Sequence, residues 1–431
     1  MVFNELMDSE RKKFYLKTLG CKVNQCDTQS LREELERRGC LETQDPREAH
    51  LSIVNTCCVT HQADRKSRQA IRQAARLKKE GAYLAVVGCY PGYDAARVTD
   101  IPDVDAAFSV SQRQEFWQWV DRRVDGQARP DNVLCRFSGR TRAFLKIQEG
   151  CDNSCRYCVV PLVRGPSRSV PFEEAVDRGR RLVEAGHAEI VLTGINLGSY
   201  RSPGKGREGL VAVIDTLAKL KGLARLRLSS LEAADVTDDL IERMVAPSKL
   251  CPHVHIPFQS GDDAVLKHMG KRLLVADYLR LVDRLRRRVP DIAITCDMIV
   301  GYPAETDRAF KNSCRFLGQV EPLKTHLFTF SPRRRTGLEK MGARVLDPRL
   351  IRERRTEMEE VAQKLAQRFK TRFLGKSVEV LIEERRGTRW FGYSGHYLRV
   401  GLKSHFCEIG SIIQAQIEDF KAGEAIAHIL I

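Results

Sequence analysis

The chain has 431 residues, of which 42% are apolar and 30% are charged. A chain of this length folds as roughly two to four domains, and this composition excludes a disordered, collagen-like or coiled-coil protein. No apolar run approaches the roughly 18 residues of a membrane-spanning helix, and the N-terminus lacks an apolar signal segment, so we expect a cytoplasmic protein without membrane association. The net charge of +16 favours a polyanionic partner.

The first third of the chain alternates between strand and helix patterns. Strands are predicted over 14–20, 51–56 and 83–88, and helices over 28–38 and 61–79. This βαβαβ order predicts a parallel sheet with right-handed crossovers. The polar stretch over 121–138 is a predicted linker, so we expect an N-terminal domain over 1–138.

The middle of the chain repeats this alternation. Buried-type strands are predicted over 143–148, 189–195, 225–230, 253–258, 292–300 and 325–330. Helical patterns lie between them, including 172–185 and 276–288, and a long charged helix over 348–371 follows the last strand. Repeated βα units of this spacing predict a partial (β/α)6 barrel of the TIM type over 139–370.

The last part of the chain changes character. Short strands are predicted over 377–383, 389–393, 397–402, 411–417 and 425–431. Their number and length predict a small antiparallel barrel of OB-like size over 371–431. The predicted fold class is therefore α/β with a small C-terminal β-barrel.

The positive charge is concentrated in the middle of the chain. Residues 139–370 contain 42 basic and 29 acidic residues, whereas 1–138 contain 22 and 20, and 371–431 contain 8 and 7. The densest basic stretch lies over 333–355. Such a stretch is often a solvated helix face, but this concentration favours contact with a phosphate backbone.

The 14 cysteines are interpreted as metal ligands or catalytic thiols rather than disulfides, because we expect a reducing compartment. Cys151, Cys155 and Cys158 form C-x3-C-x2-C directly after a predicted strand. Three thiolates at this spacing can hold three corners of a [4Fe–4S] cube and leave one iron open to a small molecule. Zinc is disfavoured because no fourth Cys or His lies nearby at zinc-ligand spacing.

A second trio is formed by Cys21, Cys57 and Cys89, which end the first three predicted strands. The carboxyl ends of parallel strands share one edge of a sheet, where ligands bind, so these residues are expected to converge. The trio is either a second metal site or three buried small residues, and Cys26 and Cys58 are competing ligands. The remaining cysteines are interpreted as ordinary thiols.

Several motifs resemble those of one enzyme family. The Cys151 motif resembles that of radical S-adenosylmethionine (SAM) enzymes. GCKVNQ at 20–25, NTC at 55–57 and GC at 88–89 are similar to the N-terminal domain of methylthiotransferases in that superfamily. KIQEGCDNSCRYCVVPLVRGPSRS, HIPFQSGDD and DMIVGYPAET also resemble that family, whose RNA-binding TRAM domain corresponds to the predicted C-terminal barrel. The segment KTLGCKVNQ resembles the MtaB-type branch, which methylthiolates N6-threonylcarbamoyladenosine at position 37 of tRNA.

The resemblance implies two [4Fe–4S] clusters and SAM as cofactors. It assigns the radical cluster to Cys151, Cys155 and Cys158, and an auxiliary cluster to Cys21, Cys57 and Cys89. These six cysteines are the predicted catalytic and metal-binding residues. The resemblance further implies that one SAM methylates a sulfur at the auxiliary cluster, and that a second SAM supplies the radical that activates C2 of the adenine.

Residues at the ends of the barrel strands are the predicted SAM contacts, since barrel active sites lie there. They are Thr193, Gly194, Asn196, Ser230, Glu232, Gln259, Ile299 and Gly301. By the resemblance, the first three lie where the SAM amino group binds, and the last two back its adenine. Ser230, Glu232 and Gln259 are alternatively plain polar caps. Asp297 is alternatively an acceptor for backbone amides.

Two segments depart from the family pattern. Tyr90 and Pro91 follow Cys89 where a small-x-Gln run is common, so we expect a different wall at the auxiliary site. SPRRRTG at 331–337 places Arg335 where the family usually has Gly. We expect Arg333, Arg334 and Arg335 to contact phosphates of the tRNA anticodon stem, which makes binding salt-dependent.

The predicted function is conversion of N6-threonylcarbamoyladenosine at position 37 of tRNA to its 2-methylthio derivative, ms2t6A. The alternatives are methylthiolation of isopentenyladenosine in tRNA, methylthiolation of an aspartate of a ribosomal protein, radical SAM chemistry of another kind, and an inert iron–sulfur RNA-binding protein. The expected partners are the tRNA anticodon stem-loop, an electron donor and a sulfur source, and the expected state is a monomer.

Overall fold

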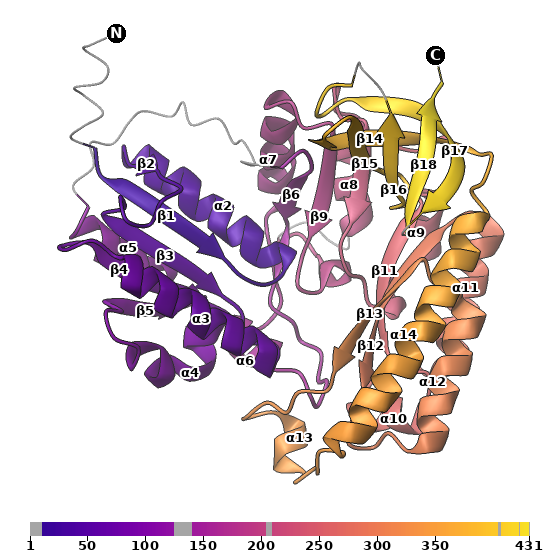
Figure 1. Cartoon of the computed structure of the whole chain (residues 1–431), viewed down its shortest axis with the longest axis horizontal. Helices are drawn as coiled ribbons and strands as arrows, with labels where there is room; N and C mark the ends of the chain where they lie inside the picture. Colours follow the sequence, from indigo (N-terminus) through magenta and orange to yellow (C-terminus); the bar gives the residue numbers. More distant parts are fainter. Residues whose placement is uncertain (1–10, 125–139, 204–208, 404–406, 422, 431) are drawn as a thin grey trace.

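The computed structural model describes residues 11–124, 140–203, 209–403, 407–421 and 423–430. An N-terminal sheet with its helices, a central partial barrel and a small C-terminal barrel follow one another along the chain (Figure 1). The predicted linker from residue 125 onward, and with it the boundary expected at 138, lies outside the described residues. The long helix that follows the last central strand ends at Thr371, and the C-terminal barrel begins at Ser377.

The N-terminal part is a five-stranded sheet in the order β2-β1-β3-β4-β5. The strands are β1 (Lys13–Thr18), β2 (Leu41–Glu42), β3 (Leu51–Thr56), β4 (Tyr83–Gly88) and β5 (Ala106–Ser109). All neighbours pair in parallel, which confirms the predicted parallel sheet. The sequence pattern missed β2 and β5, which are short strands at the two edges.

Helices cover both faces of this sheet. They are α2 (Lys22–Arg37), α3 (His61–Leu77), α4 (Cys89–Thr99) and α5 (Arg113–Asp121). Ile53 of β3 packs in one apolar cluster with α2 and α5, and its neighbour Val54 packs in another with α3 and α4. Successive strand residues point to opposite faces, so both faces of β3 are buried and its sequence is apolar without alternation. Helix α2 begins six residues before the predicted start, because Cys21 is its N-cap and its first turns are polar.

The central part contains the six predicted strands. They are β6 (Ala143–Lys146), β9 (Glu189–Thr193), β10 (Arg225–Leu228), β11 (His253–Gln259), β12 (Ala293–Val300) and β13 (Lys324–Thr329). They form two parallel sheets, β10-β9-β6 and β11-β12-β13. Bridges between Leu226 and Leu250 and between Ser230 and His255 join the two sheets, which confirms the predicted partial barrel.

Helices pack around the outside of these strands. They are α7 (Phe172–Glu184), α8 (Leu210–Ala218), α9 (Asp238–Glu242), α10 (Asp263–Met269), α11 (Val275–Arg288), α12 (Asp307–Val320) and α14 (Pro348–Thr371). Val254, Ile256 and Phe258 of β11 belong to the apolar core under these helices. Because strand side chains alternate, His253, His255 and Gln259 point to the barrel interior. In β12 the same alternation turns Thr295, Asp297 and Ile299 inward.

The N-terminal part lies against the first strand of the barrel. The thiol of Cys26 on α2 donates to the carbonyl of Phe144 on β6, with 3.6 Å between sulfur and oxygen. Asp27 on the same helix forms an ion pair with Lys146 at the end of β6. Helix α2 therefore brings its N-terminus, and with it Cys21, next to the barrel.

The C-terminal part is a closed barrel in the order β14-β15-β16-β18-β17. Its strands are β14 (Ser377–Arg386), β15 (Arg389–Ser394), β16 (Arg399–Lys403), β17 (Ile412–Lys421) and β18 (Glu424–Ile429). The predicted barrel is confirmed, with one difference, because β16 and β18 pair in parallel and the other neighbours pair antiparallel. A parallel pair cannot be recognised from short strand patterns alone.

Buried charges fix this barrel to the amino ends of the central strands. Arg227 donates to the carbonyls of Ser394 (3.0 Å) and Gly395 (2.9 Å). Arg225 donates to the carbonyl of Tyr393 at 3.1 Å. Both arginines pair with the buried Glu189, at 2.7 and 2.8 Å. Burial alone would raise the pKa of Glu189, but the charges of Arg227 and Arg225 outweigh it and hold the pKa at about 2.

Within the described residues, no helix combines the length and apolar composition needed to cross a lipid bilayer.

We predict that Glu189→Gln lowers the thermal unfolding midpoint, because it leaves Arg225 and Arg227 buried without a counter-charge. Breaking one side of a buried charge network costs about 3–5 kcal/mol. The matched control is Asp215→Asn, which removes the partly exposed pair with Arg243 and should cost less than about 1 kcal/mol.

The direction in which pH changes the stability contributed by Glu189 can be predicted. The folded pKa of Glu189 is about 2 against an ordinary 4.5, so its contribution to stability is fully present above pH 4.5 and is lost as the pH falls toward 2. The midpoints of the wild type and Glu189→Gln should therefore converge on acidification. A constant difference between pH 6 and the acid range would contradict this account.

Candidate active site

The trio of Cys21, Cys57 and Cys89 lies at the carboxyl ends of three neighbouring strands. Cys21 follows β1, Cys57 follows β3, and Cys89 directly follows β4. Gly20 has a φ of +107°, and a Cβ added there would lie 2.8 Å from the Cβ of Cys57. Gly88 has a φ of +101°, a conformation that side chains rarely adopt. The two GC motifs therefore place Cys21 and Cys89 directly after backbone conformations that favour glycine, at the same edge of the sheet as Cys57.

Two asparagines of the sequence motifs hold these strand ends together. Asn24 donates to the carbonyls of Leu19 (2.7 Å) and Thr56 (3.0 Å), which connects the ends of β1 and β3. Asn55 donates to the carbonyl of Asn24 at 2.9 Å. Both side chains are buried, so the hydrogen bonds are protected from water and fix the loop that carries Cys21.

Arg164 connects the two cysteine trios and was missed by the sequence analysis. It ends the short helix α6 (Val160–Arg164) of the central part, and its side chain is 1% exposed. Its Nε lies 3.2 Å from the sulfur of Cys89, and the same guanidinium donates to Asn24. It also forms an ion pair at 2.7 Å with Glu149, two residues before Cys151. The residue lies in the motif VRGPSRS, but a basic residue in a motif does not reveal which group it contacts.

Burial disfavours free thiolates in this trio. It raises the pKa of Cys57 and raises the pKa of Cys89 to about 12, and neighbouring cysteines of the trio raise both further. The charge of Arg164 opposes this effect at Cys89. A bound metal centre would supply the remaining positive charge that three converging thiolates need.

Neither cysteine trio is arranged as a compact site for a single ion. A tetrahedral zinc ion holds its sulfur ligands about 3.8 Å apart. Among the described residues, the only trio of His, Cys, Asp or Glu with all donor atoms within 4.8 Å of one another is His255, Asp297 and His326. In each cysteine trio the three sulfurs therefore do not all lie within 4.8 Å of one another, which is compatible with the corners of an iron–sulfur cube.

The two competing cysteines are engaged elsewhere. Cys58 is fully buried in the core of the N-terminal part, and its thiol donates to the carbonyl of Cys89 at 3.3 Å. Cys26 donates to Phe144 at the contact with the barrel. Burial raises the pKa of both thiols, which suits uncharged core residues.

The trio of Cys151, Cys155 and Cys158 lies in the loop after the short strand β7 (Gln148–Glu149). Gly150 has a φ of +71°, and an added Cβ would collide with the backbone of Pro166, so the residue before Cys151 must be glycine. The backbone of Arg156 accepts from Leu338 (2.7 Å) and donates to Met269 (3.0 Å), which anchors the loop. Burial raises the pKa of Cys155, and the nearby charge of Lys271 opposes it.

The first predicted SAM contacts surround an unsatisfied polar atom. Gly194 has no room for a Cβ, which would lie 2.8 Å from Oε1 of Gln148. The backbone N–H of Asn196 donates to that same oxygen at 2.8 Å. The Oδ1 of Asn196 is buried and has no hydrogen-bond partner among the described residues. A buried acceptor without a partner suits the amino group of SAM. The hydroxyl of Thr193, in contrast, already donates a hydrogen bond to the carbonyl of Val191.

The other predicted SAM contacts are more widely distributed around the interior. Glu232 accepts from Lys271 at 2.8 Å, so a cation lies between this carboxylate and the cysteine loop. Gln259 has a φ of +70° at the end of β11, and Ser230 pairs with His255. Ile299 points to the interior. Position 301 requires glycine because its φ is +81° and because an added Cβ would lie 2.7 Å from the side chain of Ile351 on α14.

The structure corrects the expectation for Arg333. Its side chain is 1% exposed and forms an ion pair with Asp64 of α3 at 2.7 Å. It also donates to the carbonyl of Cys58 at 3.2 Å. A buried guanidinium with these partners cannot reach a phosphate. Its role is to attach the loop after β13 to the N-terminal part.

Arg334 and Arg335 contact the same part of the protein. Arg334 forms an ion pair with Asp94, and Arg335 donates to the carbonyl of Tyr93 at 2.6 Å. Arg335 has a φ of +65°, which explains why the family pattern has glycine here. Both side chains are exposed, and their expected contact with tRNA phosphates stays a prediction.

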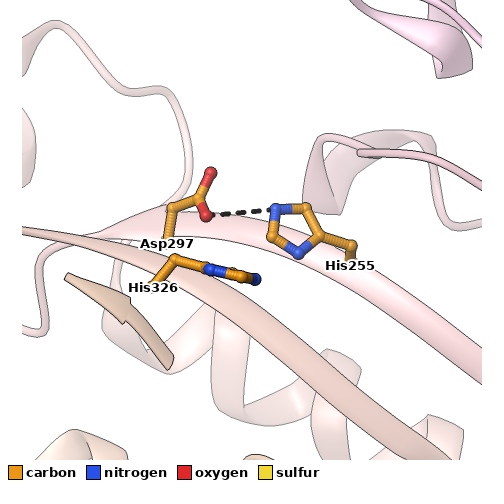
Figure 2. Close-up of side chains that lie close together, drawn as sticks. All are labelled: His255, Asp297 and His326. Carbon is orange, nitrogen blue, oxygen red and sulfur yellow. Dashed lines mark ion pairs between the residues drawn. The ribbon is translucent and has the colours of Figure 1, made fainter. Parts of the chain in front are cut away.

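Two further expectations are resolved by contacts. Tyr90 follows Cys89, at a position where this sequence differs from the family pattern. It is 1% exposed and its hydroxyl accepts a hydrogen bond from Arg68 at 3.0 Å, so it forms part of the wall behind Cys89. Asp297 does not satisfy backbone amides in the described residues. It pairs with Nε2 of His255 at 3.2 Å, as Figure 2 shows.

Comparison with known proteins agrees with this geometry. Residues 13–109 match the model of the uncharacterized protein family UPF0004, and 145–317 match the radical SAM superfamily. A Bacillus subtilis protein named threonylcarbamoyladenosine tRNA methylthiotransferase MtaB is 33% identical over 94% of this chain and 93% of its own length. A Thermotoga maritima protein of the same name is 34% identical over 90% of this chain and 91% of its own length. A Syntrophus aciditrophicus protein named tRNA-2-methylthio-N(6)-dimethylallyladenosine synthase is 32% identical over 88% of this chain and 85% of its own length.

Solved structures share the fold. The radical SAM methyltransferase TsrM of Kitasatospora setae superposes with a TM-score of 0.55 at 14% identity, covering 76% of this chain and 75% of that one. The fold and the cysteine sites thus define a radical SAM enzyme with a second cysteine trio. On the identity to the relatives above, the chain belongs to the radical SAM methylthiotransferase family. Its cofactors are SAM and [4Fe–4S] clusters.

We predict that Arg164→Lys weakens the iron site at Cys21, Cys57 and Cys89. Lysine keeps the charge but loses the planar fork that contacts Cys89, Asn24 and Glu149 together. Measured in a variant with Cys151, Cys155 and Cys158 replaced by Ala, iron release to a chelator should become about tenfold faster or more. Arg178→Lys, in an exposed pair on α7, is the control. Equal release rates would show that Arg164 does not support this site.

We predict that Arg333→Gln leaves the salt dependence of tRNA binding unchanged and lowers the thermal midpoint. Asp64 would lose its buried partner, which should lower the free energy of unfolding by about 3–5 kcal/mol. A phosphate contact would instead change the slope of log K against log salt by about 0.9. Arg344→Gln, at an exposed position of the same basic stretch, should leave the midpoint unchanged. A flatter salt slope in Arg333→Gln would restore the original expectation.

Proposed function

We propose that this chain converts N6-threonylcarbamoyladenosine at position 37 of tRNA to its 2-methylthio derivative. The observation that carries this proposal is the pair of cysteine trios connected by the buried Arg164, in a chain that matches proteins named MtaB over most of its length. A methylthiotransferase needs two sites next to each other, one for a sulfur group and one for radical formation. The contact of α2 with β6 provides this proximity.

The two trios are assigned separate roles. Cys151, Cys155 and Cys158 hold the radical cluster and leave one iron for SAM. Cys21, Cys57 and Cys89 hold the auxiliary cluster. When bound, the clusters and SAM supply the methylthio group and the radical chemistry that installs it at C2 of the adenine.

The protein side chains position these groups and keep water away. Asn196 accepts from the SAM amino group through its free Oδ1, and Gln148 holds Asn196 in place. Gly194, Gln259, Ile299 and Gly301 shape the adjoining wall. Lys271 places a positive charge between Glu232 and the cysteine loop, which favours the thiolate form of Cys155 and Cys158.

A cavity of about 570 Å³ gives the substrate access to the interior. It lies between β13, α14 and the C-terminal barrel, and its lining includes His326, Arg355, Lys370, Tyr397 and Arg399. Basic and aromatic side chains at one opening suit the phosphates and unstacked bases of an anticodon loop. We assign the tRNA anticodon stem-loop to this side of the molecule and the cytoplasm as the compartment. The chain acts as a monomer with an external electron donor and an external sulfur source.

We predict that deletion of the gene removes only the methylthio form of threonylcarbamoyladenosine from bulk tRNA. The measurement is nucleoside mass spectrometry of deletion cells complemented with the wild type or with Cys89→Ala, which removes one auxiliary ligand. The wild type should restore the nucleoside and Cys89→Ala should not. Loss of methylthiolated isopentenyladenosine would instead support the dimethylallyl branch, whose relatives are nearly as similar. No change in any nucleoside would contradict a tRNA substrate.

A further inference from the structure

Three polar side chains that belong to neither cysteine trio meet inside the barrel. His255 of β11, Asp297 of β12 and His326 of β13 lie on three adjacent parallel strands, and their donor atoms lie within 4.8 Å of one another (Figure 2). Strand alternation turns them to the same interior surface as the predicted SAM contacts Gln259 and Ile299. His326 is part of the cavity lining described above, and the trio as a group has no assigned role.

The hydrogen bonds within the trio leave one member free. His255 is engaged on both ring nitrogens, by Thr295 Oγ1 at 2.9 Å and by Asp297 at 3.2 Å. His326 packs edge to face against His255, with ring centroids 5.6 Å apart, and forms no hydrogen bond to any described residue. Since His326 also lines the 570 Å³ cavity, its ring is available to a ligand that enters there.

Lys22 brings a second free donor to the same place. It is the first residue of α2 and follows Cys21, so it reaches the barrel from the N-terminal part. The charges that act most strongly on Lys22 belong to Tyr397, Arg142, Arg227 and Asp297. Lys22 in turn acts on His326. Its ammonium forms no hydrogen bond or ion pair with any described residue, although the residue is half-buried.

The charge around the trio favours an anion over a metal ion. Two histidines and a carboxylate can ligate a divalent metal. Here, however, the charge of Asp297 acts on both Lys22 and His326, and the positive charges of Lys22 and Lys324 act on His326 as well. Arg142 and Arg227 already have acidic partners in Glu383 and Glu189. A divalent cation would be repelled by the two lysines, whereas an anionic group would give Lys22 the partner it lacks.

We propose that Lys22 and His326 bind the carboxylate of the threonyl group on the substrate nucleoside. This inference rests on the proposed function, since threonylcarbamoyladenosine carries that carboxylate and dimethylallyladenosine carries an apolar group at the same nitrogen. A site built from polar donors rejects the analogue that leaves them unpaired. Lys22 and His326 are therefore specificity-determining residues, and Asp297 is a positioning residue that fixes the wall through His255.

The test measures binding in the absence of SAM, so that no turnover occurs. Cluster-loaded full-length chain is titrated with three fluorescent anticodon stem-loops that differ only at position 37, which carries threonylcarbamoyladenosine, isopentenyladenosine or adenosine. We expect the wild type to bind the threonylcarbamoyl loop about tenfold more tightly or better than the adenosine loop, the usual effect of one charge-assisted hydrogen bond. Lys22→Met and His326→Gln should lose most of this preference.

Matched variants separate recognition from general charge and from folding. Lys66→Met removes an exposed lysine of α3, so it makes the same change in net charge and should keep the preference. Lys22→Arg keeps the charge and should retain much of it. Iron content and thermal midpoint of each variant establish that the cluster next to Lys22 is intact. In turnover with the threonylcarbamoyl substrate, Lys22→Met should raise KM more than it lowers kcat.

The outcomes distinguish this inference from the proposed function. If the wild type prefers the threonylcarbamoyl loop and Lys22→Met and His326→Gln keep that preference with intact clusters, the assignment of these residues is overturned. If the wild type prefers the isopentenyl loop, the proposed function itself is wrong. Stoichiometric binding of Zn²⁺ or Mn²⁺ that His326→Gln abolishes would show that the trio is a metal site and would also overturn the inference.

Discussion

The geometry of the proposed active site depends on one buried guanidinium. Arg164 belongs to the central part of the chain, yet it contacts the sulfur of Cys89 and the side chain of Asn24 in the N-terminal part. Its other ion pair, with Glu149, leads directly to the loop of Cys151. Because a buried charge without partners is costly, the fold tolerates Arg164 only while both parts keep their relative position. The distance between the two cysteine trios is thereby fixed by the same contact that stabilises the interface.

Buried arginines play a similar part elsewhere in the molecule. Arg225 and Arg227 attach the C-terminal barrel, and Arg333 attaches the loop after β13 to the N-terminal part. Part of the positive charge of residues 139–370 is therefore used inside the protein, at contacts between its parts. The basic composition remains compatible with a tRNA substrate, but the residues that contact RNA must be sought around the cavity beside β13 rather than at Arg333.

Much of the fold could be predicted from the sequence, and the reasons are specific. Strands such as β9 and β12 are largely apolar and buried, and the helix over 348–371 has clear termini at Asp347 and Thr371. Convergence of Cys21, Cys57 and Cys89 followed from the rule that parallel strands share a carboxyl edge. The start of α2 was missed because its first turns, which contain Lys22 and Asn24, serve the site and have no apolar period.

The contacts that organise the site could not be predicted in the same way. Arg164, Arg333 and His326 are each separated by long stretches of sequence from the groups they face, and one charged side chain does not reveal whether its partner is solvent, phosphate or a buried acid. The positive φ of Arg335 explains a departure from the family pattern only once the backbone is known. Local propensity therefore determined the elements, whereas long-range polar contacts determined which residues became functional.

The central claim is that the two cysteine trios hold two separate clusters. The most direct measurement is iron content with Mössbauer spectroscopy after anaerobic reconstitution, on the wild type and on two variants in which one trio at a time is replaced by alanine. The account predicts about eight irons in the wild type and about four in each variant, with four-iron cluster spectra in all three samples. Complete loss of iron in the variant lacking Cys151, Cys155 and Cys158, with a folded chain, would contradict it.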